Sequence, residues 1–438
     1  MSGINAGVLL LRPRDGKNMI DGDVRSSCVI PVRVDETCQE AVHVSRCLEE
    51  ELGGHLFLRQ VIEVPSSQGK RRLFVAEAQG DSFADRRWIP ADEHRADVAR
   101  AVRTTLSSAE GHDRFYDSVV EQILETPQLP WCRPDWLTGL RSRLNAHFEE
   151  PTEIYPYKMR LGHIILRAAN SRGLYEIHSA ASRDETAGWS GDALHHAEAR
   201  GLLRGWRPDL IAFFPDLGAE LREAPLGTSL AALGDLSQWS SALRSMAELQ
   251  FRSSMAGIGS NAVPADEWAS RFRASVQEWQ TYETLGRGFG ARSLEWIQDC
   301  VSDAGEVLAA SVLPQVLVNG ATTGFTTYAT ENRIQVSEWQ PTYVGHPFTT
   351  LARLLAHRGG ALARHTQADL ARPFVGAWLQ YGRPADLPKE VKAGIILGCA
   401  IQATAAWETG RAFANSATPA LRPQIAGWCE TIIRRATG

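Results

Sequence analysis

Residues 316–339 read VLVNGATTGFTTYATENRIQVSEW. Two short apolar runs, 316–318 and 334–336, are rich in valine and isoleucine, which predicts buried strands. The loop between these runs consists largely of glycine and threonine and contains a single acid. A second acid, Glu338, follows the second run and precedes Trp339. We therefore expect a small sheet that holds a polar loop next to a carboxylate.

The loop offers uncharged side chains that form hydrogen bonds: Asn319, Thr322, Thr323, Thr326 and Thr327. Threonine often bonds to the backbone of its own turn, so one interpretation is a loop that satisfies its own polar groups. The other interpretation is a neutral pocket for a small polar ligand, oriented by His178, Glu198 and Glu338. A histidine held by a carboxylate can act as a general base. The sequence leaves both interpretations open.

The segments around this stretch predict a sheet followed by helices. Residues 159–181 contain two strand-like runs about a turn at 170–173, which predicts a β-hairpin. Residues 193–206 predict a helix. Residues 393–407 form the longest apolar run, which is short for a bilayer and contains Gln402, so we expect a buried helix. Another helix is predicted by an apolar stripe at spacings of three and four residues: Leu294, Ile297, Val301, Ala304 and Leu308.

The first 125 residues predict a mixed α/β domain. Its strand-like runs lie at 6–11, 28–34, 55–64 and 71–78. Residues 35–54 predict a helix that ends at a pair of glycines. The run RRWIPADE, which follows Asp85, is expected to open another helix. Residues 126–154 combine prolines with tryptophans and predict a packed linker.

Composition sets limits on the function. The chain has 438 residues, enough for two or three domains, and its net charge of −5 does not favour nucleic acid as a partner. Its basic residues are mostly arginines, which would allow bidentate contacts to anions. The seven cysteines are scattered without zinc spacing, so we expect reduced thiols in a cytoplasm. Neither a signal peptide nor a membrane span is expected.

The N-terminal unit resembles a Nudix hydrolase domain, in which glutamates on one helix face hold magnesium against a diphosphate. The residues that keep the register of that signature are Arg46, Leu48, Glu50, Glu51 and Gly53. Cys38 and Cys47 stand where the family has glutamates, and Val32 stands where it has a glycine. Magnesium prefers several oxygen ligands at once. We therefore expect a Nudix-like fold that hydrolyses no diphosphate, with its acids on a solvated helix face.

From about residue 155 to the end, the chain resembles the aminoglycoside phosphotransferases and choline kinases. Five segments follow that family in order: GLYEIHSAA, AEARGLLRGWRPDLIAFFPD, VLVNGATTGFT, VSEW and VGHPFTTLARLL. The resemblance implies a bilobal kinase-like fold, with an N-lobe over 155–235 and a mainly helical C-lobe over 236–438. With the Nudix-like domain over 1–125 and the linker over 126–154, the expected fold class is α/β plus α+β.

Several residues that this family uses for phosphoryl transfer are replaced. His178 stands in place of the lysine that binds the nucleotide, whereas Glu198 keeps the helix glutamate. In the loop, Asn319 replaces a histidine, Ala321 replaces the aspartate that accepts the substrate proton, and Thr326 replaces a metal-binding asparagine. Phosphoryl transfer depends on a metal, a cationic side chain and a base acting together. The usual kinase route is therefore not expected.

The remaining positions of the motif are closer to the family. Glu338 stands where the family has its metal-binding aspartate, Trp339 keeps the tryptophan that follows, and Thr350 replaces a structural aspartate. Three functions stay open: a pseudo-enzyme that binds a small polar ligand, a transferase with altered chemistry, and a residual small-molecule kinase. The donor for a transferase would be a polyanion such as a nucleotide, a coenzyme or an aminoacyl-tRNA.

The resemblance also implies which side chains form the site and where the protein acts. We expect Glu338, His178 and Asn319 to be catalytic. The expected ligand-binding residues are Glu198, Thr322, Thr323, Thr326 and Trp339. No cofactor and no metal site are expected. A fusion of these two folds suggests a cytoplasmic protein of specialised bacterial metabolism, such as antibiotic production.

Overall fold

The structure is a computed structural model, and the chain divides into two compact units. Unit 1 contains residues 1–186, 210–223 and 409–423, and unit 2 contains 187–209, 224–408 and 424–438. The residues that the structure describes are 3–14, 17–21, 29–35, 41–66, 69–79, 81, 83, 85–106, 120, 129–160, 163–180, 191–258, 263–281, 289–330, 334–339, 341–356, 360–414 and 422–437. The division of the chain into segments 1–125, 126–154, 155–235 and 236–438 stays a prediction from the sequence.

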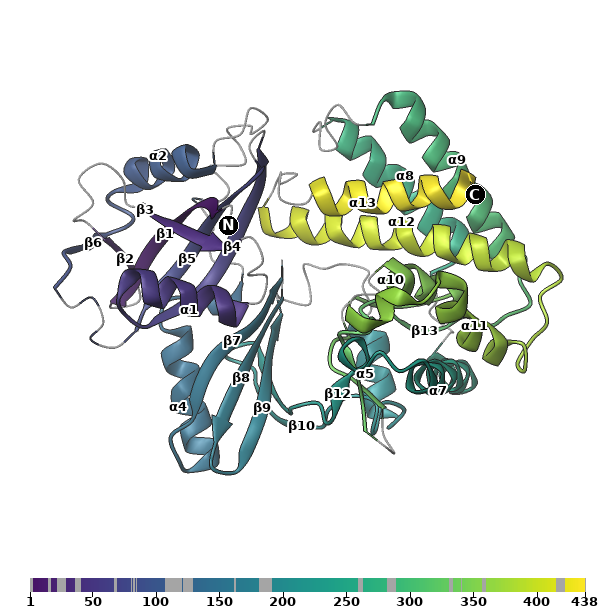
Figure 1. Cartoon of the computed structure of the whole chain (residues 1–438), viewed down its shortest axis with the longest axis horizontal. Coiled ribbons are helices and arrows are strands. Elements are labelled where there is room, and N and C mark those ends of the chain that lie inside the picture. Colours follow the sequence, from purple (N-terminus) through teal and green to yellow (C-terminus); the bar gives the residue numbers. More distant parts are fainter. Residues whose placement is uncertain are drawn as a thin grey trace. The chain divides into compact units, whose positions relative to one another are not determined.

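A six-stranded sheet in unit 1 is covered by a helix on each face (Figure 1). Its elements are β1 Gly3–Arg14, β2 Lys17–Asp21, β3 Val29–Asp35, β4 Leu56–Ser66, β5 Gly69–Ala78, β6 Trp88–Pro90, α1 Ala41–Leu52 and α2 Arg95–Leu106. The strand order is β4-β5-β1-β2-β6, with β3 paired to β1 and β1 parallel to β5. Side chains alternate along a strand, so Val8 packs with Leu48 of α1 and Leu9 packs with Val98 of α2.

One helix prediction next to this sheet is wrong, and another is confirmed in part. The run RRWIPADE does not open a helix, because Trp88–Pro90 pairs with β2 as a strand and α2 begins only at Arg95. A residue before proline is disfavoured in the helical region, which explains the extended backbone at this point. Of the helix predicted over 35–54, the described part is confirmed as α1 Ala41–Leu52, whereas Asp35 belongs to β3; Gly53 follows the helix with a φ of 72°, which glycine tolerates. Residues 36–40, including Cys38, lie outside the described part of the chain.

The second sheet of unit 1 is antiparallel, in the order β10-β11-β9-β8-β7. Its elements are β7 Glu153–Arg160, β8 His163–Asn170, β9 Gly173–Ala180, β10 Leu210–Phe214, β11 Ala219–Glu223 and the packed helix α4 Trp136–Phe148. The predicted hairpin is confirmed: the Asn170 side chain accepts hydrogen bonds from the N–H groups of Arg172 (3.0 Å) and Gly173 (3.3 Å). One face of this sheet packs on α4 through apolar side chains such as Leu140 and Ile177.

The linker that precedes α4 is packed, as the prolines and tryptophans predicted. It contains a short 3₁₀ helix, η1, at Pro130–Cys132. Trp131 and Trp136 are both buried. Their indole N–H groups donate to backbone carbonyl oxygens, at 3.0 Å and 2.8 Å. Both tryptophans therefore bury large apolar rings without leaving a polar group unpaired.

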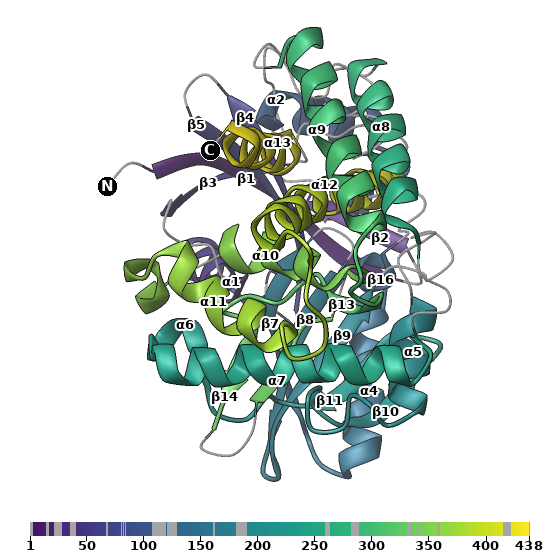
Figure 2. The same cartoon turned by 90° about the vertical axis from the view of Figure 1, so that its right-hand side faces the viewer.

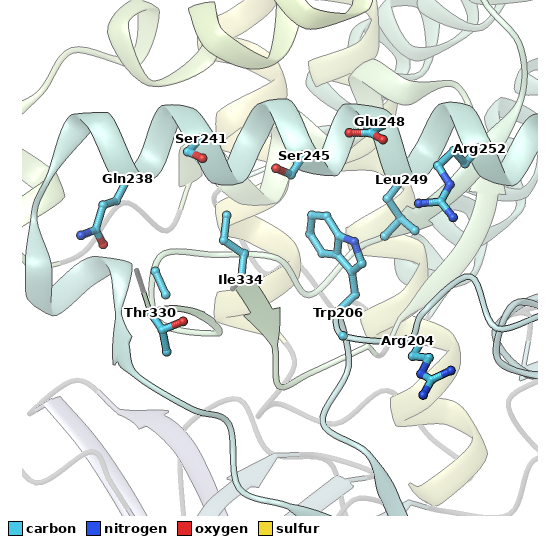
Figure 3. Close-up of a pocket in the computed structure, with 12 residues that line it drawn as sticks. Arg204, Trp206, Gln238, Ser241, Ser245, Glu248, Leu249, Arg252, Thr330 and Ile334 are labelled. Atoms are coloured by element: carbon cyan, nitrogen blue, oxygen red, sulfur yellow. The ribbon is translucent and has the colours of Figure 1, made fainter. Parts of the chain in front are cut away.

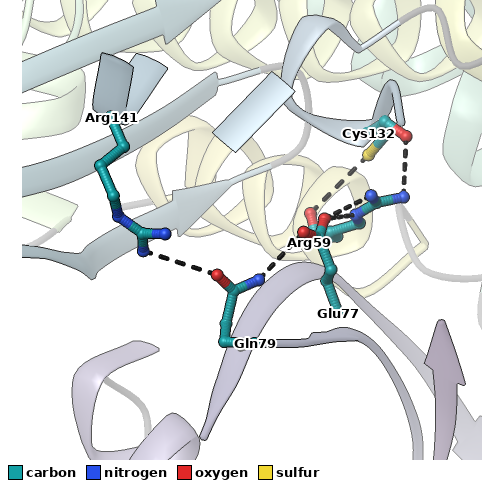
Figure 4. Close-up of polar contacts among 5 residues, drawn as sticks. All are labelled: Arg59, Glu77, Gln79, Cys132 and Arg141. Carbon is teal, nitrogen blue, oxygen red and sulfur yellow. Dashed lines mark hydrogen bonds and ion pairs between the residues drawn. The ribbon is translucent and has the colours of Figure 1, made fainter. Parts of the chain in front are cut away.

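A buried ion pair connects this linker to the first sheet (Figure 4). Arg59 on β4 pairs with Glu77 on β5, with 2.8 Å between Nε and a carboxylate oxygen, and both side chains are buried. A second guanidinium nitrogen of Arg59 donates to the Cys132 carbonyl at 3.1 Å. Gln79 donates to the other oxygen of Glu77 and accepts from Arg141 on α4. This network therefore spans β4, β5, η1 and α4.

Helices dominate unit 2. They are α5 Gly191–Ala199, α6 Leu230–Leu233, α7 Leu236–Met255, α8 Ala265–Thr281, α9 Ala291–Ala309, α10 Thr350–Ala356, α11 Gln367–Trp378, α12 Leu387–Ala414 and α13 Arg422–Thr437, with the end of α12 assigned to unit 1. Helices α8 and α9 lie side by side, as do α12 and α13 (Figure 2). The stripe predicted on α9 is buried along its whole length, and the apolar run at 393–407 lies in the buried part of α12. The helix predicted over 193–206 is wrong beyond Ala199, because Gly201 and Gly205 adopt positive φ values that end it.

Short strands in unit 2 flank the threonine-rich loop that follows Val318. They are β12 Thr228–Ser229, β13 Val316–Asn319, β14 Thr327–Ala329, β15 Ile334–Val336 and β16 Thr342–Gly345. The runs at 316–318 and 334–336 are strands, as predicted. They do not pair with each other: β13 pairs with β16, whereas β15 pairs with β14, which also pairs with β12.

Candidate functional site

The ends of β13 and β15 meet at the candidate site in unit 2. The Asn319 side-chain amide donates to the backbone carbonyl of Glu338 at 2.9 Å, and its amide oxygen accepts from the Ala321 N–H at 2.8 Å. The Gly320 N–H donates to the Pro341 carbonyl at 2.8 Å. Two motifs that lie almost twenty residues apart in the sequence are thus joined through one asparagine side chain. The amide of Asn319 orders the site and is committed to the backbone.

Gly320 is fixed at this position by close packing. A Cβ atom there would lie 2.7 Å from the side-chain nitrogen of Gln402 on α12 and 2.9 Å from the Pro341 carbonyl oxygen. The same Gln402 nitrogen donates to the Gly320 carbonyl at 3.1 Å. The glycine therefore lets the loop approach α12 and form this hydrogen bond.

The threonines of the loop bond mostly to the loop itself. The Thr326 hydroxyl donates to the Ala321 carbonyl and accepts from the Thr323 N–H, both at 2.9 Å. The Thr327 hydroxyl donates to the Thr323 carbonyl at 2.8 Å. All of these side chains are buried. Of the two interpretations left open by the sequence, these contacts favour a loop that satisfies its own polar groups.

Thr322 is the exception among these threonines. It is 1% exposed, and its hydroxyl has no hydrogen-bond partner within the described residues. Leaving a buried hydroxyl unpaired costs about 1–3 kcal/mol. Such a group is one that a bound molecule or a water could satisfy.

The acid of the site is deeply buried. Glu338 is 2% exposed and follows β15, and the neighbouring Trp339 donates its indole N–H to the Val336 carbonyl at 2.9 Å. The Ser337 N–H donates to the Thr326 carbonyl at 2.9 Å. This bond holds the strand end against the loop. A carboxylate in such a place requires compensation for its lost hydration.

A histidine near the site is held neutral. Burial lowers the pKa of His346, which follows β16, from 6.5 to about 3. Its Nδ1 accepts from the Phe348 N–H at 3.3 Å, which leaves Nε2 to donate to the Ser311 hydroxyl at 3.1 Å. Both ring nitrogens are used in the fold. His346 is therefore not a proton carrier near neutral pH.

His178 lies in unit 1, on the face of the second sheet opposite its apolar core. Its Nε2 lies 3.1 Å from a carboxylate oxygen of Glu176, which is fully buried. Glu198, the partner that the sequence suggested, belongs to unit 2 and pairs with Arg207. The spacing of Glu176 and His178 could have identified this pair, because residues two apart on a strand point to the same face.

Charged residues surround that histidine in the sheet. Arg167 on β8 and Arg222 on β11 lie opposite Glu176 in the strand register. Arg222 is 2% exposed and donates to Glu220 at 2.8 Å. The Arg167 guanidinium stacks over a tyrosine ring, 3.7 Å from its centre, and lies 3.9 Å from Glu176. Sequence reasoning missed both arginines, since neither stands in a motif.

The acids expected to hold magnesium in a Nudix domain lie on α1. Glu50 and Glu51 are exposed. Glu49 accepts the Leu56 N–H at 2.9 Å, so its carboxylate supports the turn after the helix. Within the described ranges, no three histidine, cysteine, aspartate or glutamate side chains are grouped so that they could bind a metal ion. A search for membrane-spanning helices among the described residues also finds none.

Comparisons with known proteins give structural neighbours only. No protein-family model matches the chain, and no curated protein matches it significantly. The choline kinase of Cryptosporidium parvum matches with a TM-score of 0.45 and 11% identity, over 65% of this chain and 91% of that one. A thermostable mutant of an aminoglycoside phosphotransferase matches at 0.47 and 13%, over 68% and 99%. The ethanolamine kinase of Plasmodium vivax matches at 0.45 and 9%, over 79% and 93%.

Proposed function

We propose that this chain works by binding a small polar molecule and does not transfer phosphoryl groups by the kinase route. The observation that carries this proposal is the environment of Ala321. Its side chain is fully buried and cannot accept a proton, and its N–H and carbonyl are bonded to Asn319 and Thr326. The loop thus has no side chain that can act as a base, and its polar side chains form hydrogen bonds mostly to its own backbone. The buried Thr322 hydroxyl, which has no partner among the described residues, and the Glu338 carboxylate beside the loop are the groups that we propose contact the ligand.

A second candidate is a transferase that uses different chemistry. His178 favours it, because an imidazole bonded to a buried carboxylate is the arrangement of a general base and the residue that orients it. In such a reaction the imidazole would take a proton from a hydroxyl or amine acceptor, which then attacks the donor as the donor's leaving group departs. A nucleotide, a coenzyme or an aminoacyl-tRNA is the class of donor proposed.

Two substitutions, Glu338→Gln and His178→Gln, test both proposals. A thermal-shift screen of nucleotides, amino acids and sugars comes first; a ligand at 100 times its Kd stabilises the folded chain by about 2.7 kcal/mol. We expect Glu338→Gln to weaken binding of the hit about tenfold, or about 1.4 kcal/mol. His178→Gln should leave binding intact and abolish product formation if the transferase proposal holds. The controls are Glu306→Gln and His195→Gln, which change exposed residues of α9 and α5.

The outcomes separate the proposals. Parent-like binding in Glu338→Gln would remove that carboxylate from the ligand site. Product formation that survives His178→Gln would end the transferase proposal and leave the binding protein. A reaction lost equally in His195→Gln would point to a general effect on the fold.

We also propose that the first sheet, with α1 and α2, is a Nudix-like unit without hydrolase activity. The exposure of Glu50 and Glu51 and the structural hydrogen bond of Glu49 support this proposal. Incubation with ADP-ribose and excess magnesium should release no nucleotide. Release that disappears in Glu50→Gln would show that the unit is an active hydrolase.

A further inference from the structure

A groove runs along α7 in unit 2 (Figure 3). It has a volume of about 420 Å³ and is lined by α7, the turn at 204–206 and the β14–β15 hairpin. None of the loop residues 319–327, nor Glu338, lines it. Its volume lies within the range of about 300–1,000 Å³ that is typical of small-molecule sites. We call it the α7 groove.

The helix presents a polar stripe to the α7 groove. Gln238, Ser241, Ser245 and Arg252 recur at spacings that place them on one side of α7. A serine hydroxyl in a helix often bonds to a carbonyl one turn earlier, as the part-buried Ser240 does at 2.7 Å. Ser241 and Ser245 make no such bond with the described residues. Their hydroxyls are therefore available to a molecule in the groove.

One end of the α7 groove is positively charged. In Figure 3, Arg204 and Arg252 lie beyond Trp206, at the end opposite Gln238. Neither arginine forms an ion pair within the described part of the chain, and neither does Glu248, the acid of the lining. Two guanidinium groups and one carboxylate give this end a net positive charge, which favours a ligand with an anionic group there.

An aromatic ring lies in the middle of the α7 groove. Trp206 is half-buried, and its backbone carbonyl is fixed by the Val336 N–H at 2.7 Å. The indole N–H has no partner among the described residues. At the far end, the side-chain oxygen of Gln238 is buried and also lacks a partner in the described chain. An unpaired acceptor inside a groove is a place where a ligand donor gains a hydrogen bond.

We propose that the α7 groove is a second ligand site. It takes an elongated small molecule that carries a phosphate or carboxylate at the arginine end, a flat ring over Trp206 and hydrogen-bond donors toward Gln238. From Gln238 to Arg252, α7 rises about 21 Å, which is why an elongated molecule suits the site. The α7 groove shares no residue with the loop at 319–327 or with Glu338, so either site can be tested without the other.

Calorimetric titration of the full chain with two probes tests this site. Adenosine monophosphate presents a phosphate and indole-3-acetate presents a carboxylate, each next to a flat ring. We expect at least one probe to bind with a Kd of about 1 mM or tighter. The pair of substitutions Arg204→Gln and Arg252→Gln should weaken that binding by at least about tenfold. Arg244→Gln, an exposed arginine of α7 outside the groove, is the matched control and should bind like the parent.

Substitution of Trp206 is the second part of the test. Trp206→Phe keeps a flat ring and should keep most of the affinity, whereas Trp206→Ala should lose it. Failure of both probes with the parent chain, or equal binding by the parent and the double arginine variant, overturns the proposal. Binding of only one probe shows whether the groove selects phosphate or carboxylate.

Discussion

At the scale of single residues, the loop after β13 is organised by hydrogen bonds of its threonines within the loop and by one bond of Asn319 that leaves it. Asn319 joins the loop to the backbone of Glu338, and Thr326 closes it by bonding to Ala321 and Thr323. The hydrogen-bond partners of Thr326 lie only three and five residues away in the sequence. Only tertiary structure could show that the amide of Asn319 reaches a residue beyond β15.

Two buried threonines test the structural role of this loop. Thr326→Val should destabilise the chain by about 1–3 kcal/mol, because it leaves a buried carbonyl and a buried N–H without their partner. Thr404→Val on α12 is the matched substitution, since the Thr404 hydroxyl is fully buried and has no partner in the described residues. It should be neutral or stabilising. Chemical denaturation measures both, and equal losses of stability would contradict the account of the loop.

At the scale of elements, hydrophobic patterning predicted most of the strands and helices, and local backbone effects explain the errors. The hairpin of β8 and β9 and the buried stripe of α9 follow directly from sequence spacing. The C-terminal half of the helix expected over 193–206 was wrong because two glycines take positive φ values. The pairing partners of β13 and β15 could not be predicted, since strand pairing depends on contacts distant in sequence.

The site residues, too, could be predicted only in part. The sequence identified Asn319 and Glu338 through their motifs, and the structure places them side by side. It did not identify Glu176 as the partner of His178, or the α7 groove, because a groove depends on segments brought together from three parts of the chain. The roles expected for the predicted residues stay predictions.

The buried ion pair between β4 and β5 gives a prediction at this scale. Arg59→Met should destabilise the chain by about 3–5 kcal/mol, because it leaves Glu77 as an uncompensated buried charge. Adding Glu77→Leu removes that charge, and the double variant should recover much of the loss. Denaturant unfolding of the parent, both single variants and the double variant gives the coupling. Additive losses would show that the two side chains act independently.

At the scale of the whole molecule, the chain divides into two compact units, whereas the sequence predicted two or three domains with other boundaries. The sequence could not indicate which segments cluster, because residues 210–223 return to unit 1 after the chain has entered unit 2. The structural neighbours are choline and ethanolamine kinases and aminoglycoside phosphotransferases. The proposed function rests on the residues of this chain, above all on the buried Ala321, which stands where the kinases that the chain resembles have an aspartate.

The most direct test of that proposal is calorimetric titration of the full chain with magnesium–ATP, followed by an assay for ADP release. In the kinases that the chain resembles, an aspartate, a lysine and an asparagine stand at the positions of Ala321, His178 and Thr326, so we expect no magnesium-dependent binding and no ADP above the protein-free rate. A cooperative thermal transition of the same sample serves as the control, because it shows that the chain is folded when no binding is seen. Saturable magnesium-dependent binding accompanied by ADP release that falls in Glu338→Gln would contradict the account and identify a working kinase.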